Sequence, residues 1–130
     1  MRAAIIGTGY IGRVHARLIR ELGGEVVAAC GRTLASAQGF GVGAAYDNVD
    51  AMLSAEKPDV VHVCSPNHFH AEHAIKAFKS GAHVMCEKPM ATTLDECRRM
   101  IDAADKAKRV GAIAYCYRGY PLIRELRRRV

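Results

Sequence analysis

The sequence predicts an α/β fold in which a doubly wound, mostly parallel sheet carries helices on both faces. Short apolar or β-branched runs alternate with amphipathic helical patterns along the whole chain. A Gly-x-Gly-x-x-Gly turn joins the first of these runs to the first helical pattern. Polar residues follow directly after several of the strand-like runs. Strands that are joined by helices pair in parallel through right-handed crossovers, and this arrangement produces a doubly wound sheet.

Six strands and at least five helices are expected, with capping residues near several helix ends. The predicted strands cover residues 2–6, 25–30, 44–46, 59–64, 82–86 and 110–115. The predicted helices cover residues 10–22, 34–39, 49–54, 68–80 and 93–108. Gly23 ends the first helix, Asn48 caps the third, and Thr93 with Glu96 forms a capping box at the start of the fifth. Pro121 suits the first turn of one further helix.

The turn after the first strand has the composition of a dinucleotide phosphate site. Gly7 allows a tight turn, Gly9 presents no Cβ to a pyrophosphate, and Gly12 lets the helix pack close to the strand. The N–H groups around Tyr10 and Ile11 are free to bind phosphate, and the helix dipole favours its charge. We interpret the turn as a nucleotide site, with a purely structural glycine turn as the alternative.

A cofactor crevice is expected at the carboxyl edge of the sheet, because ligands of doubly wound sheets bind outside the carboxyl ends of the strands. Four polar or glycine-rich stretches are predicted at that edge: Gly7 to Gly12, Gly31 to Thr33, Ser65 to Asn67, and Glu87 to Pro89. Ordinary loop punctuation explains one or two such stretches, whereas a crevice explains all four.

The second strand end predicts that NADP(H) is preferred over NAD(H). An acidic residue about 20 positions beyond the glycine turn normally holds the ribose 2′-hydroxyl of NAD. Gly31 occupies that place, and Arg32 and Thr33 follow it. The Arg32 guanidinium can pair with a 2′-phosphate and stack on adenine, and Thr33 can add a hydrogen bond.

The composition favours a single cytoplasmic domain. No apolar run approaches the roughly 20 residues of a membrane span, and the first residues form a strand pattern rather than a signal peptide. The net charge of +6 is concentrated in residues 118–130, which hold five arginines and one glutamate. We therefore expect no membrane partner and no nucleic-acid partner, with binding through the arginine tail as the alternative. Five cysteines without a C-x-x-C pair are typical of reduced core thiols.

Four histidines are candidates for a site. His15 lies on the first predicted helix, where it can either approach a cofactor or cap and pack. His68, His70 and His73 form an H-x-H-x-x-H pattern that can present metal ligands on a helix. No carboxylate or cysteine completes a ligand set at suitable spacing, so we expect no metal.

Three stretches resemble the nucleotide-binding domain of the glucose–fructose oxidoreductase, inositol dehydrogenase and rhizopine catabolism (Gfo/Idh/MocA) family. They are Gly7 to Gly12 with His15, Ser65-Pro66-Asn67-His68-Phe69-His70, and Gly81 to Met90 with the sequence GAHVMCEKPM. The last two are specific to the family, and the resemblance covers essentially the whole chain. It implies a Rossmann fold that binds NAD(P).

The resemblance implies roles for the residues that follow the fourth and fifth strands. Ser65, Pro66 and Asn67 would line the nicotinamide ribose and ring, and His70 would close that wall. Glu87 would bind ribose hydroxyls.

The resemblance also implies that Lys88 is catalytic. Lys88 would hydrogen-bond the substrate hydroxyl and stabilise the developing alkoxide, and Pro89 would aim it by restricting its backbone. A solvated loop lysine is the alternative, and the Lys88–Pro89 peptide bond can be cis. Arg118 resembles a family arginine near the substrate pocket, although Gly119 follows it where an aromatic residue is usual.

The resemblance implies two parts in this chain. Residues 1–117 would be the NAD(P)-binding Rossmann domain, and residues 118–130 would begin the connection to a C-terminal substrate domain that is absent. In the family that domain forms the oligomer interface and supplies an Asp and a His for proton transfer. The function implied is hydride transfer between nicotinamide and a secondary alcohol or ketone of a sugar or cyclitol, with little activity for the chain alone. A non-catalytic regulatory or partner-dependent nucleotide-binding module is the alternative.

Overall fold

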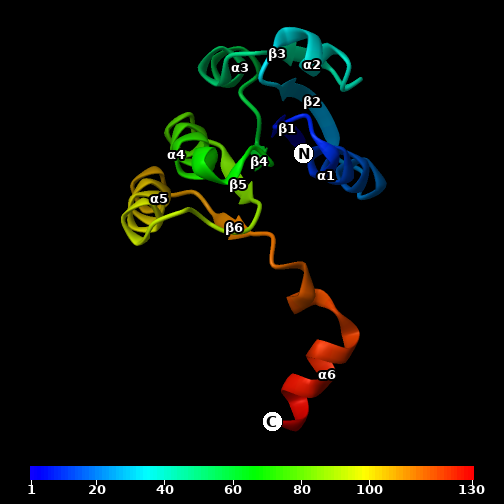
Figure 1. Cartoon of the computed structure of the whole chain (residues 1–130), viewed down its shortest axis with the longest axis vertical. Helices are drawn as coiled ribbons and strands as arrows, with labels where there is room; N and C mark the ends of the chain where they lie inside the picture. Colours follow the sequence, from blue (N-terminus) through cyan, green and yellow to red (C-terminus); the bar gives the residue numbers. More distant parts are fainter.

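The computed structural model describes residues 1–130, and its centre is a six-stranded parallel sheet (Figure 1). The strand order is β3-β2-β1-β4-β5-β6, and every neighbouring pair is parallel. The strands are β1 (Arg2–Ile6), β2 (Glu25–Cys30), β3 (Ala44–Tyr46), β4 (Val60–Val63), β5 (His83–Cys86) and β6 (Gly111–Ile113). The order reverses between β1 and β4, which places the topological switch point at the carboxyl ends of these two strands.

Helices lie on both faces of the sheet, as the sequence predicts. The α-helices are α1 (Tyr10–Glu21), α2 (Leu34–Gln38), α3 (Val49–Glu56), α4 (His70–Lys79), α5 (Leu94–Ala107) and α6 (Pro121–Arg129), with 3₁₀ turns η1 (Asn67–Phe69) and η2 (Cys116–Gly119). Figure 1 shows α3, α4 and α5 side by side on one face and α1 on the other. The doubly wound α/β prediction is confirmed.

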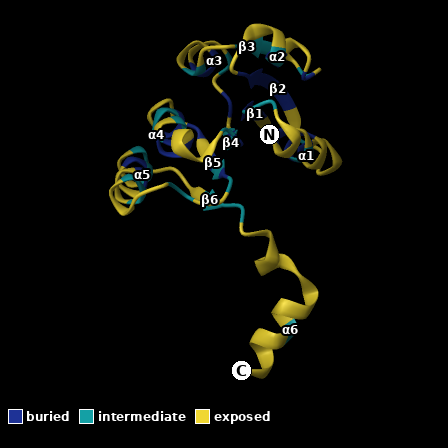
Figure 2. Cartoon of the chain, viewed as in Figure 1, coloured by how far each residue is buried: buried dark blue, intermediate teal, exposed yellow.

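Two apolar layers hold the helices against the sheet, and β1 contributes to both because its side chains alternate. Ala3 and Ile5 pack with Ala16 and Ile19 of α1. Ala4 and Ile6 belong to the larger layer, which α3, α4 and α5 cover. The larger layer includes Met52, Leu53, Ala74, Phe78 and Met100. Figure 2 shows the buried residues concentrated along the strands and on the inner sides of these helices.

The element boundaries differ from the predicted ones by a few residues. The predicted helix over residues 68–80 begins as the 3₁₀ turn η1, and α4 itself starts at His70. The predicted strand over residues 110–115 is only Gly111–Ile113. Thr33 caps α2 by accepting a hydrogen bond from the N–H of Ser36, while the Ser36 side chain caps Thr33 in return.

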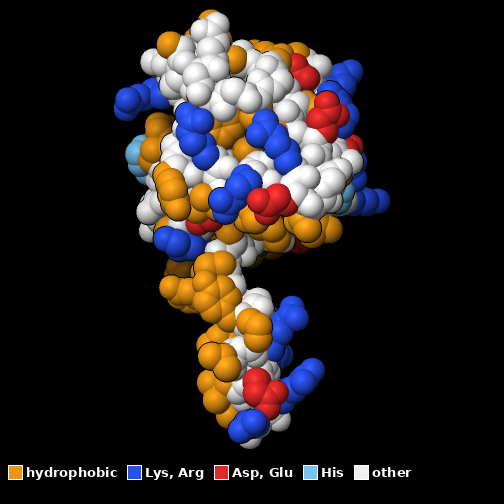
Figure 3. Space-filling model, turned by 90° about the vertical axis from the view of Figure 1, so that its right-hand side faces the viewer, with side chains coloured by type: hydrophobic (Ala, Val, Ile, Leu, Met, Phe, Trp, Pro, Cys, Tyr) orange, Lys and Arg blue, Asp and Glu red, His pale blue; other side chains and the backbone are white.

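The last segment, η2 and α6, extends away from the body (Figure 1). None of the residues in α6 is buried. Figure 3 shows hydrophobic side chains along one side of this arm and Lys or Arg side chains along the other. The exposed apolar residues are Tyr117, Tyr120, Leu122, Ile123, Leu126 and Val130. Across the molecule, no helix has the length and apolar character required to cross a membrane.

Candidate functional site

The predicted stretches after β1, β2 and β4 meet at the carboxyl edge of the sheet and enclose one hollow of about 460 Å³. The N–H of Gly7 donates a hydrogen bond to the carbonyl of Cys30 at 2.9 Å, which ties the first turn to the end of β2. The hollow is lined by Gly7, Thr8, Gly9, Arg32, Thr33, Ser36, Cys64, Ser65 and Pro66. Residues that the sequence assigns to a dinucleotide therefore surround a single space.

The three glycines of the motif differ in whether the fold has room for a side chain at that position. Gly7 has φ of +107°, and a Cβ there would collide with the carbonyl of Cys64. A Cβ at Gly12 would collide with the carbonyl of Gly7. Gly9 has no protein atom within 4 Å of the position that a Cβ would take. The fold itself requires Gly7 and Gly12, whereas no contact within the protein requires Gly9, and the space beside it is open to a ligand.

The backbone next to Gly9 is open to a ligand. Gly9 is the N-cap of α1, and no side chain caps the free N–H groups of the first turn. The Tyr10 side chain is 83% exposed, and Ile11 is also exposed, so neither closes the turn. Free N–H groups and the positive end of a 12-residue helix make this position suitable for a phosphate.

A second hollow of about 230 Å³ adjoins the first and contains an acidic residue that the sequence analysis did not consider. It is lined by Arg32, Asp47, Pro66 and Phe69, among others. Asp47 directly follows β3, and its carboxylate forms no hydrogen bond or ion pair within the protein. Asp47 follows a strand directly, as Glu87 does after β5, and this position in the sequence is the signal that identifies it.

Lys88 is exposed at the end of β5, and its ammonium forms no ion pair. It lines a hollow of about 550 Å³ together with residues from Ala114 to Arg118. The Lys88–Pro89 peptide bond is cis. The structure thus brings Lys88 and Arg118 to one hollow.

Glu87 points inward rather than into open solvent. Its Oε1 lies 3.1 Å from Nε2 of His15, and its Oε2 accepts a hydrogen bond of 3.2 Å from the N–H of Lys88. The His15 and Glu87 side chains are 10% and 13% exposed. His15, on α1, therefore contacts the Glu87-Lys88-Pro89 turn directly.

His62 extends this contact into the sheet. Its Nδ1 lies 2.9 Å from Nδ1 of His15, and the two rings meet edge to face. Burial lowers the pKa of His62 to about 4, and the neighbouring His15 contributes in the same direction. His62 is opposite Ile5 in the β1–β4 register, so it lies on the face of the sheet that α1 covers. The sequence analysis missed it; a histidine inside a run of valines is the signal that could have identified it.

His70 is 1% exposed, so it lies behind the crevice wall rather than on its surface. Its Nδ1 is 2.7 Å from the carbonyl oxygen of Pro89, and its Nε2 is 2.9 Å from the carbonyl oxygen of Ser65. His70 thus holds the turns after β4 and β5 together. Asn67 starts η1 and is exposed at the same edge.

His73 and the buried thiols Cys64 and Cys86 show no sign of a metal site or of a reactive nucleophile. Nδ1 of His73 is 2.9 Å from the hydroxyl of Ser65, and burial is the main cause that lowers the pKa of His73. No three His, Cys, Asp or Glu side chains converge in a way that could hold a metal ion. Burial is also the main cause that raises the pKa of Cys64 and Cys86 to about 12 each. Both thiols therefore stay protonated at neutral pH, which makes them poor nucleophiles.

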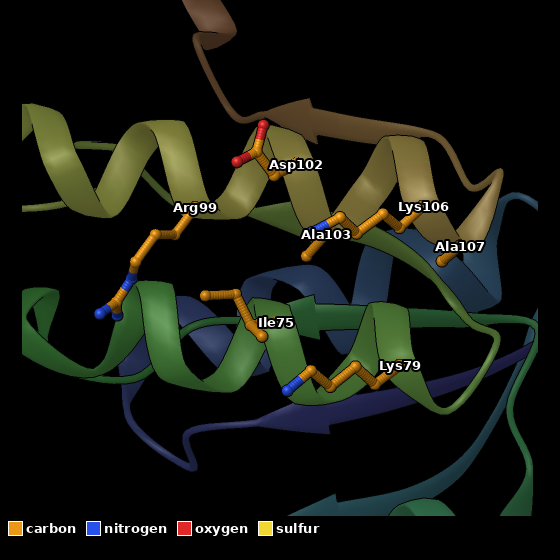
Figure 4. A pocket seen from close by; sticks show the side chains of 7 residues that line it. All are labelled: Ile75, Lys79, Arg99, Asp102, Ala103, Lys106 and Ala107. Carbon is orange, nitrogen blue, oxygen red and sulfur yellow. The ribbon is translucent and has the colours of Figure 1, made fainter.

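A hollow of about 610 Å³, larger than the three at this edge, lies away from it between α4 and α5 (Figure 4). It is lined by Ile75 and Lys79 from α4 and by Arg99, Asp102 and Lys106 from α5, among others. No strand end reaches this groove, and its walls are two parallel helix surfaces, so it lacks the converging backbone N–H groups of the crevice. We therefore place the candidate site at the carboxyl edge.

Comparison with protein families decides the classification. Residues 1–115 match the model of the Gfo/Idh/MocA family, described as an oxidoreductase family with an NAD-binding Rossmann fold. The chain belongs to this family. The resemblance inferred from the Gly7 to Gly12, Ser65 to His70 and Gly81 to Met90 stretches is thereby confirmed, as is the Rossmann fold.

The curated relatives are longer than this chain. The D-glucoside 3-dehydrogenase of Escherichia coli is 44% identical over 126 residues, which are 91% of this chain and 35% of that protein. Inositol 2-dehydrogenase 3 of Saccharopolyspora erythraea is 35% identical, over 97% of this chain and 40% of that protein. The chain spans between one third and two fifths of these relatives.

Solved structures give the same result. The myo-inositol 2-dehydrogenase of Lactobacillus plantarum superposes with a TM-score of 0.88 at 30% identity, over 98% of this chain and 40% of that one. The WlbA dehydrogenase of Bordetella pertussis, solved in complex with NADH and UDP-GlcNAcA, has a TM-score of 0.85 at 27% identity, over 91% of this chain and 36% of that one.

Proposed function

We propose that this chain is the dinucleotide-binding part of an oxidoreductase that transfers hydride between a nicotinamide cofactor and a secondary alcohol or ketone of a sugar or cyclitol. The observation that carries the proposal is the open backbone at Gly9, beside the meeting point of three strand ends. The names of the inositol and glucoside dehydrogenases among the relatives support the substrate class.

The dinucleotide would lie across the carboxyl edge. Its pyrophosphate would accept hydrogen bonds from the N–H groups at the start of α1, next to Gly9. Its adenine would occupy the hollow between Arg32 and Phe69. Its nicotinamide would lie beside Ser65 to Asn67, towards Lys88. Bound in this way, the nicotinamide supplies or accepts the hydride.

Lys88 would act on the substrate oxygen. Its ammonium has no partner within the protein, and a cation positioned there can stabilise the negative charge that develops on the substrate oxygen. Arg118 lines the same hollow and would contact the substrate. The hydroxyl proton would pass to a histidine and an aspartate of a further domain, as the family resemblance implies, so the chain alone would have little dehydrogenase activity.

We also propose that NADP(H) binds more tightly than NAD(H). Gly31 leaves no acid at the end of β2, and the Arg32 guanidinium forms no ion pair with a side chain of the protein. It is therefore available to a 2′-phosphate, with the Thr33 hydroxyl beside it. The Asp47 carboxylate lines the adjoining hollow and opposes a second negative charge. The preference should therefore be modest and should depend on the balance of Arg32 and Asp47.

We propose the same division of the chain that the sequence suggests. Residues 1–117 would form the NAD(P)-binding domain, and residues 118–130 would lead into a substrate domain through which the complete protein oligomerises. The exposed apolar side of α6 supports this division (Figure 3). Five free thiols support a cytoplasmic location.

Calorimetric titration of the purified chain with NADPH tests the proposal. We expect a dissociation constant between micromolar and millimolar, because the purified chain has the phosphate turn but not the proposed substrate domain, which would form the other wall of the site. Added sugars or cyclitols should give little turnover. In the complete enzyme, Lys88→Ala should lower the rate by on the order of 10² while dinucleotide affinity changes little. Failure to bind any nicotinamide dinucleotide at millimolar concentration would overturn the proposal.

A further inference from the structure

Three polar side chains, His62, His15 and Glu87, form a hydrogen-bonded network beneath the crevice. His62 on β4 contacts His15 on α1, and His15 contacts Glu87 after β5. The Nδ1–Nδ1 distance is 2.9 Å, and the distance from Nε2 of His15 to Oε1 of Glu87 is 3.1 Å. These residues are 47 and 72 positions apart in sequence. The network therefore links three separate elements of the fold.

Hydrogen-bond chemistry determines which ring nitrogens carry protons in this network. A carboxylate only accepts hydrogen bonds, so Nε2 of His15 carries the proton that it shares with Glu87. One proton then lies between the two Nδ1 atoms, on His62 if His15 is neutral and on His15 if His15 is cationic. In either form His15 has both ring nitrogens engaged, and its ring cannot turn without losing two hydrogen bonds.

The hydrogen-bonded network ends at the Lys88 turn. The second carboxylate oxygen of Glu87 accepts the backbone N–H of Lys88 at 3.2 Å. Glu87 thus connects His15 to the main chain of the residue whose ammonium would meet the substrate. On α1 itself, His15 is one turn beyond Gly12, so the same helix that would bind the pyrophosphate also holds the Lys88 turn.

Packing alone does not explain these residues. The other buried side chains of α1 are Ala16 and Ile19, which are apolar. The buried His15 ring and the partly buried Glu87 carboxylate and His62 ring lose hydration, and apolar residues of similar volume would fill the space without that cost. A polar network at this position is consistent with a requirement for a defined geometry.

We propose that His15 is a positioning residue for the Lys88 turn: it holds the Glu87 carboxylate, Glu87 holds the backbone of Lys88, and His62 fixes the orientation of the His15 ring. This proposal rests on the proposed function, because it assigns the nicotinamide end of the dinucleotide to the Lys88 turn. Neither histidine contacts the reacting atoms. The effect of His15 should therefore be confined to ligands that reach the nicotinamide end.

Binding of NADH and of ADP to the full chain separates positioning from general stability. ADP has the adenosine and the pyrophosphate but lacks the nicotinamide and its ribose. His15→Ala should raise the Kd for NADH about tenfold, because it releases the Glu87 carboxylate that would bind the ribose hydroxyls, and should change the Kd for ADP by less than about twofold. His15→Gln, whose amide can donate to Glu87, should restore part of the NADH affinity. His83→Ala is the matched control, because His83 accepts one hydrogen bond, from Val110, at the opposite end of β5.

The outcomes are distinct. If the unsubstituted chain binds none of NADPH, NADH and ADP, the proposed function fails, and this inference fails with it. If it binds NADH and ADP and His15→Ala weakens both equally or neither, the inference is wrong while the proposed function stands. If His15→Ala does not fold, ¹⁵N spectra of the unsubstituted chain decide instead. Nε2 of His15 should show a protonated, pyrrole-type signal, and an unprotonated Nε2 would contradict the inference.

Discussion

The two halves of the crevice are built by different means. The phosphate half, Gly7 to Gly12 with Gly31 to Thr33, is shaped by main chain, and a Cβ at Gly9 would have no neighbour within 4 Å. The lysine half, Ser65 to His70 with Glu87 to Pro89, is held by buried side chains. His70 contacts the carbonyl oxygens of Ser65 and Pro89, and His15 contacts Glu87.

The two halves should therefore be sensitive to different changes in side chain and in pH. A backbone site tolerates no added Cβ at the point where a ligand approaches, and its shape does not depend on the protonation of a histidine. A site held by imidazoles depends on protonation and on exact side-chain length. Substitutions and pH changes should therefore affect the two halves differently.

The largest effect is expected in the phosphate half, from Gly9→Val. The Cβ of the new side chain has no neighbour within 4 Å, so the fold should persist, but the side chain would occupy the proposed space of the pyrophosphate. Binding of both ADP and NADPH should be lost in calorimetry. Gly119→Val is the matched control, because Gly119 is also free of neighbours within 4 Å and lies outside the phosphate turn. Unchanged affinity of Gly9→Val would mean that the phosphates bind elsewhere.

A smaller effect, on stability, is expected in the lysine half as the pH falls. The pKa of His62 is about 4 in the folded chain against an ordinary 6.5. Folding therefore favours neutral His62, so its stabilisation is complete above about pH 6.5 and is lost as the pH falls towards 4, up to about 3 kcal/mol. Urea unfolding over this pH range should show the loss, and His62→Asn should reduce it. An equal pH dependence in both proteins would exclude His62 as its source.

The smallest effect is expected for cofactor choice, again in the phosphate half. Arg32→Ala should weaken NADPH about tenfold and NADH much less, since it removes one charge-assisted contact to the 2′-phosphate. Asp47→Asn should strengthen NADPH relative to NADH, because it removes the opposing charge. Paired dissociation constants provide the measurement. Tighter binding of NADH than of NADPH by the unsubstituted chain would reverse the proposed preference.

The same comparison explains how much could be predicted from the sequence. The phosphate half depends on local backbone geometry, and the spacing of Gly7, Gly9 and Gly12 after an apolar run is sufficient to predict it. The fold class and the meeting of strand ends follow from the alternation of elements.

The lysine half depends on contacts between distant residues. The contact of His15 with Glu87 requires the strand order and the β1–β4 register, neither of which a single pattern encodes. His70 is on the predicted helix, but its burial behind the wall depends on the path of Pro89. The Thr33 capping box was missed because its partner is Ser36 rather than the usual Glu or Gln.

One measurement tests the central claim, that the dinucleotide lies across the carboxyl edge of the sheet. Amide chemical shifts of the ¹⁵N-labelled chain, recorded during titration with NADPH, locate the ligand directly. We expect the shifts to concentrate at Gly9, Arg32, Ser65 and Lys88, with little change in the groove between α4 and α5 (Figure 4). Shifts centred on Arg99 and Lys106 in that groove, with Gly9 unaffected, would contradict the account.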